Sequence, residues 1–137
     1  MGILLDSTII IAAERSGENP RQVVEQIAFH LGDTEATLSV VTVIELAHGI
    51  ARASSAERRA ERERFLQELL QVFTVEPVSV PIAIRAGKVD GELASKGTRI
   101  ALPDLLIGAT ALELGYSVAT HNSRHFELIP GLTVKKL

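Results

Sequence analysis

Short, mainly apolar runs alternate along the chain with longer segments whose apolar residues recur every three or four positions. Clear runs of the first kind lie at residues 3–5, 37–41 and 116–120, and weaker ones at 75–80 and 132–134. Such a run is typical of a strand buried on both faces of a parallel sheet. The run at 75–80 contains Pro77 and is interpreted as a short strand or an extended connector.

The periodic segments predict helices at residues 7–14, 20–31, 42–50, 55–73, 83–96 and 103–114. Pro20 and Pro103 suit a first helical turn, and Gly97 and Gly115 suit the position after a last turn. Strands that alternate with helices predict an α/β fold: a three-layer α/β/α arrangement with a mainly parallel sheet. Because no linker or repeat interrupts the pattern, residues 1–137 are expected to form a single domain.

The composition limits which partners, metal sites and cellular compartments are expected for such a domain. The chain has 137 residues, near the commonest domain size, and a net charge of -3, so nucleic acid would need a local basic patch or a metal ion to be held. It has no cysteine, which excludes disulfides and thiolate metal sites and agrees with a cytoplasmic setting. Asp6 and Glu14 interrupt and close the first apolar stretch, so we expect neither a signal peptide nor a membrane span.

Acidic and amide side chains stand where predicted strands end or the next helices begin: Asp6, Glu45, Asp104 and Asn122. The carboxyl ends of parallel strands line one crevice, where α/β proteins bind their ligands. Carboxylates gathered there repel one another unless a cation lies between them, and oxygen-only ligation suits Mg²⁺ or Mn²⁺. The pattern therefore predicts a metal site at this edge of the sheet.

Each of these residues also has an ordinary structural explanation. An Asp after a strand, such as Asp6, often caps the next helix, and Thr42 to Glu45 matches a capping box, which we favour for Glu45 on local grounds. Asp104, in the first turn of a helix, would interact favourably with the helix dipole. Asn122 is of a residue type that is common in turns. A phosphoryl-accepting Asp6 is disfavoured because that motif needs a second acid two residues on. Together, the three acids and the Asn are more specific than any one alone.

Neighbouring residues would support such a site. Thr8 and Thr120 place hydroxyls at the same strand ends, where they can bind a water molecule or a carboxylate. Arg124 is placed to touch a phosphate, as is His125, although a packed turn histidine is the more conservative interpretation of His125. A run of small residues should also let the helix that carries Asp104 lie close to the sheet: Gly108, Ala109 and Ala111.

One candidate basic patch is present: Arg52, Arg58, Arg59, Arg62 and Arg64. Glutamates are interleaved with it: Glu57, Glu61, Glu63 and Glu68. At helical spacing such residues form salt bridges on a helix surface. We therefore predict a solvated face here rather than a track for RNA.

The order Asp6, Glu45, Asp104, Asn122 resembles the acidic quartet of the PIN-domain ribonucleases, and the local strings resemble the VapC-type toxins of bacterial toxin–antitoxin pairs. The resembling segments span nearly the whole chain: ILLDST at 3–8, VIELAHG at 43–49, PDLLIGATAL at 103–112 and THNSRHFE at 120–127. Two features depart from the common pattern. Ser7 follows Asp6 where many members carry Thr, and Asn122 replaces a fourth acid, which weakens the case for a second metal ion.

The resemblance implies a metal-dependent endoribonuclease that hydrolyses RNA phosphodiester bonds and leaves a 5′-phosphate and a 3′-hydroxyl. In that case Asp6 and Asp104 would bind Mg²⁺, or Mn²⁺ in its place, and Glu45 would bind it directly or through water. Asn122 would complete the catalytic set by orienting water. Three further residues would support it: Thr8, Thr120 and Arg124.

The resemblance also implies partners: an RNA substrate, a cognate VapB-like antitoxin and a second copy of the chain, with no membrane. The apolar residues that suggest a homodimer are Ile44, Ile50, Phe65, Leu69, Leu70, Ile84 and Val89. Two alternatives remain open. One is a PIN binding module of low activity, and the other is a nuclease of housekeeping RNA processing.

Overall fold

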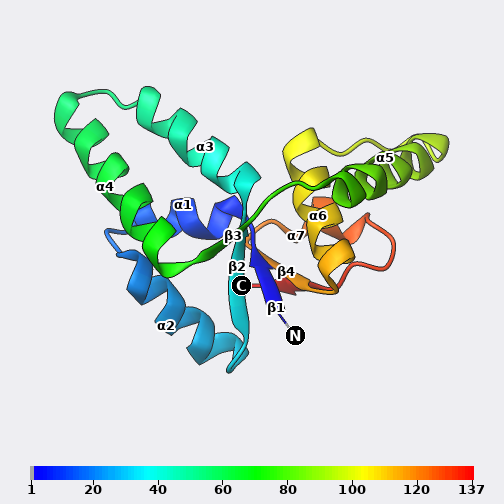
Figure 1. Ribbon diagram of the computed structural model, residues 1–137, viewed down its shortest axis with the longest axis horizontal. Helices are drawn as coiled ribbons and strands as arrows, with labels where there is room; N and C mark the ends of the chain where they lie inside the picture. Colours follow the sequence, from blue (N-terminus) through cyan, green and yellow to red (C-terminus); the bar gives the residue numbers. More distant parts are fainter. Residues whose placement is uncertain (1) are drawn as a thin grey trace.

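A five-stranded sheet lies at the centre of the computed structural model, which describes residues 2–137 (Figure 1). Its strands are β1 (Gly2–Leu5), β2 (Glu35–Ser39), β3 (Thr74–Glu76), β4 (Ser117–Thr120) and β5 (Val134–Lys136). The helices are α1 (Ser7–Arg15), α2 (Pro20–Leu31), α3 (Val40–Ala51), α4 (Ala56–Val72), α5 (Val80–Ser95), α6 (Leu102–Leu114) and α7 (Ser123–Glu127).

Neighbouring strands of the sheet all run parallel, in the order β3-β2-β1-β4-β5. The mainly parallel sheet predicted from the sequence is thereby confirmed. The chain builds outward from β1 to β2 and β3, and then crosses to the other side of β1 for β4 and β5. The order therefore reverses between β1 and β4, which is where open α/β sheets bind their ligands.

Helices cover both faces of the sheet, so the predicted three-layer arrangement is also confirmed (Figure 1). Successive side chains of β1 point to opposite faces: Leu5 packs in a core with residues of α1, α2 and α4, and Leu4 in a core with residues of α5 and α6. Leu4 and Leu5 are both fully buried. Burial of a side chain of this size stabilises the fold by roughly 1.5–3 kcal/mol.

Local capping explains where several helices begin and end. At the start of α2, Asn19 Oδ1 accepts a hydrogen bond of 3.0 Å from the Gln22 N–H, and Gln22 Oε1 accepts one of 2.8 Å from the Asn19 N–H. At the start of α4, Ser55 Oγ accepts from the Arg58 N–H at 3.1 Å. Gly115 closes α6 with φ of 71°, in the left-handed region that favours glycine.

Helix α3 begins earlier than the sequence predicted. Its N-cap is Ser39, whose Oγ accepts from the Val41 N–H at 3.0 Å, so β2 ends at Ser39 and not at residue 41. Thr42 lies inside the helix, and Glu45 lies in the second turn instead of the first. The capping-box explanation of Glu45 was therefore wrong.

Other boundaries differ from the predicted ones by a few residues. Helix α5 begins at Val80 instead of residue 83, because Ser79 Oγ accepts from the Ile82 N–H at 3.4 Å. Strand β5 lies at Val134–Lys136 instead of 132–134, in register with β4, and the short helix α7 was not predicted. Within residues 2–137, every helix is too short or too polar to cross a membrane.

Candidate active site

The carboxyl ends of β1 and β4 bring Asp6 and Thr120 together. Leu5 is in register with Leu38 of β2 and with Ala119 of β4, so the residues that follow these three emerge at one edge of the sheet. The Asp6 N–H donates to the Ala119 carbonyl at 2.9 Å, which fixes the Asp6 backbone against β4. Asp6 therefore lies at the reversal of the strand order.

The Asp6 side chain is only 2% exposed. Its Oδ2 accepts hydrogen bonds from Thr8 Oγ1 at 2.7 Å and from Thr120 Oγ1 at 2.8 Å. Its Oδ1 is buried without a hydrogen-bond partner among residues 2–137. Asp6 occupies the N-cap position of α1, but its side chain turns to the two threonines instead of capping the helix. Capping therefore does not explain this carboxylate.

Glu45 is the second carboxylate of the site, and one of its two oxygens accepts a hydrogen bond. Ser7, in the first turn of α1, donates from Oγ to Glu45 Oε2 at 3.1 Å, while Oε1 is buried and unpartnered within the described part of the chain. Burial raises the pKa of Glu45, the Ser7 hydrogen bond opposes this, and the charges of Asp6 and Asp104 raise it further. The three carboxylates therefore lie within electrostatic reach of one another.

Asp104 lies in the first turn of α6, directly after Pro103. Its Oδ2 is 3.0 Å from Nδ1 of His125 on α7, and the Asp104 side chain is 25% exposed. The conservative interpretation of His125 as a packed turn histidine was wrong, because this residue lies in a helix and its side chain is 49% exposed. His125 and Asp104 instead form a direct pair between α7 and α6.

Among the small residues of α6, Gly108 acts differently from the prediction. A Cβ atom at Gly108 would overlap the side chain of Ile129, so Gly108 admits the segment after α7 instead of a strand. Ala109 and Ala111 are buried in the core beside the sheet. The close packing around Gly108 thus holds the segment after α7 against α6, the helix that carries Asp104.

Asn122 and Arg124 follow β4, and within residues 2–137 no hydrogen bond or ion pair joins their side chains to these carboxylates. The Asn122 N–H donates to Thr120 Oγ1 at 2.9 Å, and this contact involves only the backbone of Asn122. The Asn122 side chain and Arg124 are exposed. Their roles in orienting water and touching phosphate remain predictions, whereas Thr8 and Thr120 contact Asp6 directly.

The carboxylates fit a divalent metal ion that prefers oxygen ligands. No three His, Asp or Glu side chains of residues 2–137 converge on one point as they lie. Two of their oxygens, Asp6 Oδ1 and Glu45 Oε1, are nevertheless buried without a donor. Leaving a buried charged oxygen unpaired is costly, and a cation bound by such a carboxylate would relieve that cost.

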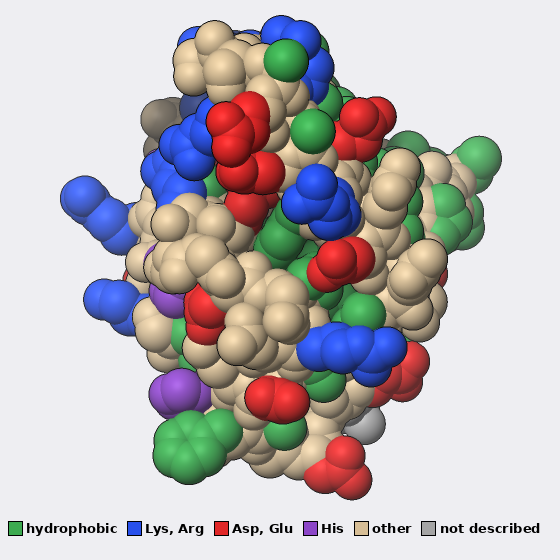
Figure 2. Space-filling model, turned by 90° about the vertical axis from the view of Figure 1, so that its left-hand side faces the viewer, with side chains coloured by type: hydrophobic (Ala, Val, Ile, Leu, Met, Phe, Trp, Pro, Cys, Tyr) green, Lys and Arg blue, Asp and Glu red, His purple; other side chains and the backbone are tan. Residues whose placement is uncertain are grey.

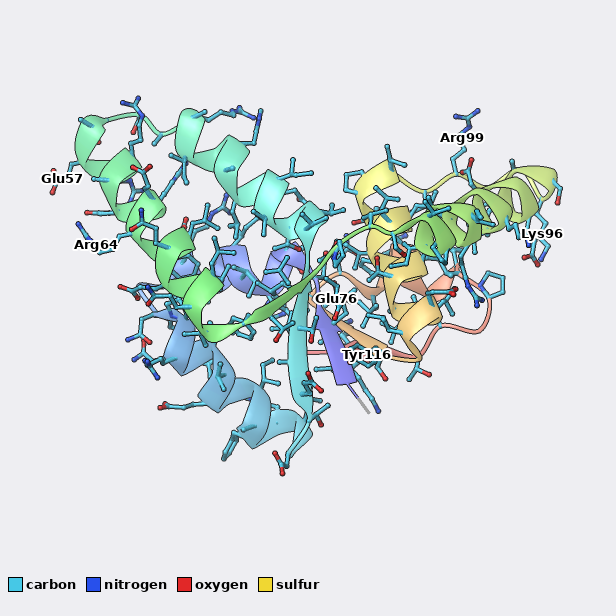
Figure 3. The ribbon with its side chains drawn as sticks, in the orientation of Figure 1. Glu57, Arg64, Glu76, Lys96, Arg99 and Tyr116 are labelled. Atoms are coloured by element: carbon cyan, nitrogen blue, oxygen red, sulfur yellow. The ribbon has the colours of Figure 1, made fainter. Side chains whose placement is uncertain are left out.

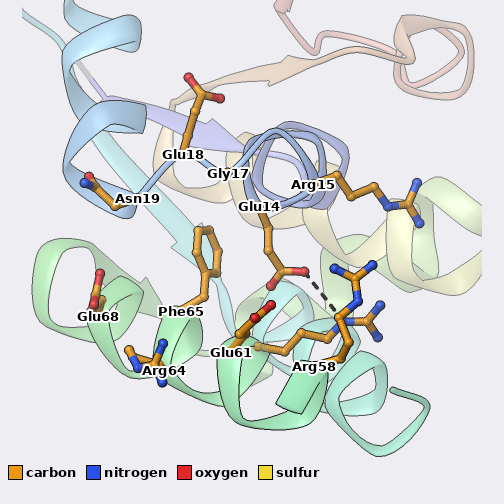
Figure 4. A pocket seen from close by; sticks show the side chains of 11 residues that line it. Glu14, Arg15, Gly17, Glu18, Asn19, Arg58, Glu61, Arg64, Phe65 and Glu68 are labelled. Carbon is orange, nitrogen blue, oxygen red and sulfur yellow. Dashed lines mark ion pairs between the residues drawn. The ribbon is translucent and has the colours of Figure 1, made fainter. Parts of the chain in front are cut away.

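A groove opens between α4 and the end of α1 with the loop that follows it (Figure 4). Arg62 Nε lies 3.9 Å from Glu14 Oε1, and Arg62 Nη1 donates to the Gly49 carbonyl at 2.6 Å. Burial raises the pKa of Glu14, and nearby arginines, Arg62 foremost, oppose that rise. A smaller cleft lined by both Glu14 and Glu45 lies between the groove and the acidic edge.

The arginines of α4 are largely exposed, as predicted, but they do not pair as predicted. Within residues 2–137, the arginine of α4 that forms an ion pair is Arg62, and its partner is Glu14 on α1 instead of a glutamate of α4. Glu57 lies on the outer side of α4, whereas Arg64 lines the groove (Figures 3 and 4). Basic and acidic side chains are interspersed over this face (Figure 2), which is therefore a solvated surface of mixed charge.

Sequence reasoning missed the residues that hold the second and third carboxylates. Ser7 was noted only as a departure from a motif, yet it donates to Glu45. Its position directly after Asp6 was the available signal, because both residues emerge from β1 toward the same edge. The pairing of His125 with Asp104 had no sequence signal, because it depends on how α7 packs against α6.

Comparisons with known proteins agree with this arrangement. The PIN domain family model matches residues 3–132. Ribonuclease VapC1 of Rickettsia felis is 31% identical over 134 residues, which cover 98% of this chain and 95% of that protein. The tRNA(fMet)-specific endonuclease VapC of Salmonella typhimurium is 33% identical, over 78% of this chain and 79% of that protein. The solved VapBC-1 structure from nontypeable Haemophilus influenzae superposes with a TM-score of 0.82 at 26% identity, covering 99% and 98% of the two chains.

Proposed function

This chain belongs to the PIN-domain family, in its VapC ribonuclease branch, and we propose from that premise that Asp6, Glu45 and Asp104 bind one catalytic Mg²⁺ ion. The chain is an endoribonuclease, the toxin of a toxin–antitoxin pair, and hydrolyses RNA phosphodiester bonds. We also propose that residues 1–137 act as one PIN domain and that the chain cleaves RNA in the cytoplasm. The single observation that supports the metal site is that Asp6 Oδ1 and Glu45 Oε1 are both buried and have no hydrogen-bond partner among residues 2–137.

The choice of metal follows from the ligand chemistry. The candidate ligands are carboxylate oxygens, which suit Mg²⁺ and also Mn²⁺, and the chain has no cysteine to favour a softer ion. We propose Mg²⁺ as the resident ion and Mn²⁺ as a working substitute. When bound, the ion supplies Lewis acidity toward the phosphoryl oxygen and lowers the pKa of an attacking water molecule.

The protein's own residues have separable tasks in this reaction. Thr8 and Thr120 hold Oδ2 of Asp6, so the carboxylate keeps one orientation with Oδ1 directed elsewhere. Ser7 holds Oε2 of Glu45 in the same way. Two exposed neighbours act on the substrate side: Asn122 orients water, and Arg124 contacts a phosphate of the RNA.

The acidic edge also suits inhibition by a VapB-like antitoxin. The negative charges of Asp6, Glu45 and Asp104 would attract an arginine side chain, whose fork of donors pairs well with carboxylates. We propose that the antitoxin places such an arginine at this edge and excludes the metal ion. An antitoxin shortened to lack this arginine should still bind but no longer inhibit.

We further propose that two copies of the chain pair in solution. Of the apolar residues that suggested this from the sequence, Phe65, Leu69 and Val89 are buried in the protein's own core. Ile44 (63%), Leu70 (46%) and Ile84 (54%) are exposed, and Ile50 is half-buried. Two apolar residues outside that set are exposed as well: Val80 (73%) and Leu102 (64%). The exposed apolar side chains of α3 and α5 support pairing through these helices.

Growth of cells that express the chain tests the toxin function. Expression of the wild-type chain alone should arrest growth, and Asp6→Ala should abolish the arrest at equal amounts of folded protein. Co-expression of the antitoxin should restore growth. If the soluble, folded wild-type chain is harmless, the toxin function is contradicted, and a PIN binding module or a housekeeping nuclease becomes the better account.

A further inference from the structure

Two carboxylates of the candidate site each have one oxygen held by side-chain donors. Asp6 Oδ2 is held by two threonines, and Glu45 Oε2 by Ser7. The second oxygens, Asp6 Oδ1 and Glu45 Oε1, are buried and unpartnered among residues 2–137. For the third carboxylate, Asp104, the same pattern requires another side chain that donates a hydrogen bond to one of its oxygens.

His125 supplies that donor. Its Nδ1 lies 3.0 Å from Asp104 Oδ2. An ionised carboxylate only accepts hydrogen bonds, so the hydrogen must be on Nδ1 in either the neutral or the charged imidazole. The contact fixes one Asp104 oxygen and leaves the other for a ligand.

The position of His125 is itself fixed by packing. Helix α7 is anchored through Phe126, which is 1% exposed, and through the buried Ser123. Ile129, in the next turn of chain, packs where Gly108 of α6 has no side chain. His125 thus stands on a helix that is held against α6, so its hydrogen bond can set the orientation of Asp104.

We propose that His125 is a positioning residue for Asp104, which orients this carboxylate for the metal ion in the way that Thr8, Thr120 and Ser7 orient the other two. The inference rests on the proposed metal site and adds to it the residue that holds its third ligand. Partners that hold metal ligands in this way commonly account for 10–100-fold in metal affinity.

Mn²⁺ binding to the purified chain, measured by calorimetry without RNA, tests the proposal. His125→Ala should weaken Mn²⁺ binding about 10-fold or more. His125→Asn should restore most of the affinity, because its amide nitrogen can take the place of Nδ1 as a donor to Asp104. His30→Ala, which removes an exposed histidine on α2 whose Nδ1 contacts the Gln26 carbonyl, should leave the affinity unchanged.

Two results would overturn the role of His125. Unchanged or tighter Mn²⁺ binding in His125→Ala would show that the pair does not help Asp104 to bind metal. An activity loss that persists at saturating Mn²⁺ and is not rescued in His125→Asn would assign His125 to the substrate. Asp104→Ala separates these failures from failure of the metal site: equal Mn²⁺ binding by wild type and Asp104→Ala would contradict the proposed site itself.

The pair can also be observed directly in the metal-free protein. Nitrogen–proton correlation spectra of the imidazole should place the His125 hydrogen on Nδ1, and Asp104→Ala should abolish that preference. His30 in the same spectra should be unaffected by Asp104→Ala. A neutral His125 with its hydrogen on Nε2 in the wild-type chain would contradict the proposed hydrogen bond.

Discussion

Thr120 Oγ1 donates a hydrogen bond of 2.8 Å to Asp6 Oδ2, across 114 positions of the sequence. The bond joins the ends of β1 and β4 at the point where the strand order reverses. It is buried and made to a charged acceptor, and hydrogen bonds of that kind stabilise by about 1.5–3 kcal/mol. This single contact therefore links the topology of the sheet to the orientation of the first carboxylate.

Thr120→Val should reduce metal affinity and RNA cleavage by about 10-fold or more, because Asp6 loses one of the two donors that hold Oδ2. Thr110→Val is the matched control, since Thr110 is also fully buried but donates to the Leu106 carbonyl within α6. Both variants should lose stability in urea titrations. Equal cleavage by Thr120→Val and wild type would show that this hydrogen bond has no part in the site.

Asp6→Asn and Asp104→Asn should keep the fold in EDTA, and each should be as stable as wild type or more stable. Removing one charge relieves repulsion with the neighbouring carboxylates, and Asn keeps an oxygen that can accept the hydrogen bonds made to the Asp. Chemical denaturation measures the difference, with the exposed Asp33→Asn as a control. A large loss of stability in both site variants would indicate structural roles for these carboxylates.

Glu45 should make the stability of the metal-free chain depend on pH. Burial, together with the charges of Asp6 and Asp104, raises the pKa of Glu45 above its ordinary value of 4.5 in the folded state. The folded chain then binds this proton more tightly than the unfolded chain, so stability falls as pH rises from about 4.5 through the raised pKa. Glu45→Gln should remove this fall.

Urea titrations in EDTA at several pH values measure that effect. The stability gain of Glu45→Gln over wild type should be larger at pH 7 than at pH 4, and the exposed Glu25→Gln serves as the control. A gain that does not change with pH would contradict a raised pKa at Glu45.

Dimerisation predicts a mass of two chains in light scattering at micromolar concentration. Ile44→Glu and Ile84→Glu place charges on the exposed apolar surface of α3 and α5, so each should reduce the mass to that of one chain. Phe29→Glu is the control: Phe29 is 85% exposed but lies on α2. A wild-type mass of one chain would contradict pairing.

The residues that the sequence located well are those whose positions follow from strand ends. Asp6 and Asp104 could be assigned because the run at 3–5 and Pro103 fix the adjacent boundaries. The start of α3 could not, because the β-branched residues Val40, Val41 and Thr42 favour a strand locally and are helical here. That error moved Glu45 by one turn and produced a false capping box.

The hydrogen bonds around the acids were beyond sequence reasoning for a different reason. Thr8 and Thr120 could be named as hydroxyls at strand ends, but their joint contact with one Asp6 oxygen depends on side-chain orientation. His125 could not be paired with Asp104 because α7 spans five residues, too few for a periodic apolar pattern.

RNA cleavage by the purified wild-type chain, with the ends of the products mapped, tests the central claim most directly. Mg²⁺ or Mn²⁺ should support cleavage that leaves 5′-phosphates, EDTA should abolish it, and restored Mg²⁺ should recover it. Asp6→Asn, purified in parallel, should lose most of this activity in Mg²⁺ and thereby exclude a contaminating nuclease. Cleavage that continues undiminished in EDTA, or that Asp6→Asn retains in full, would contradict a metal-dependent ribonuclease built on these carboxylates.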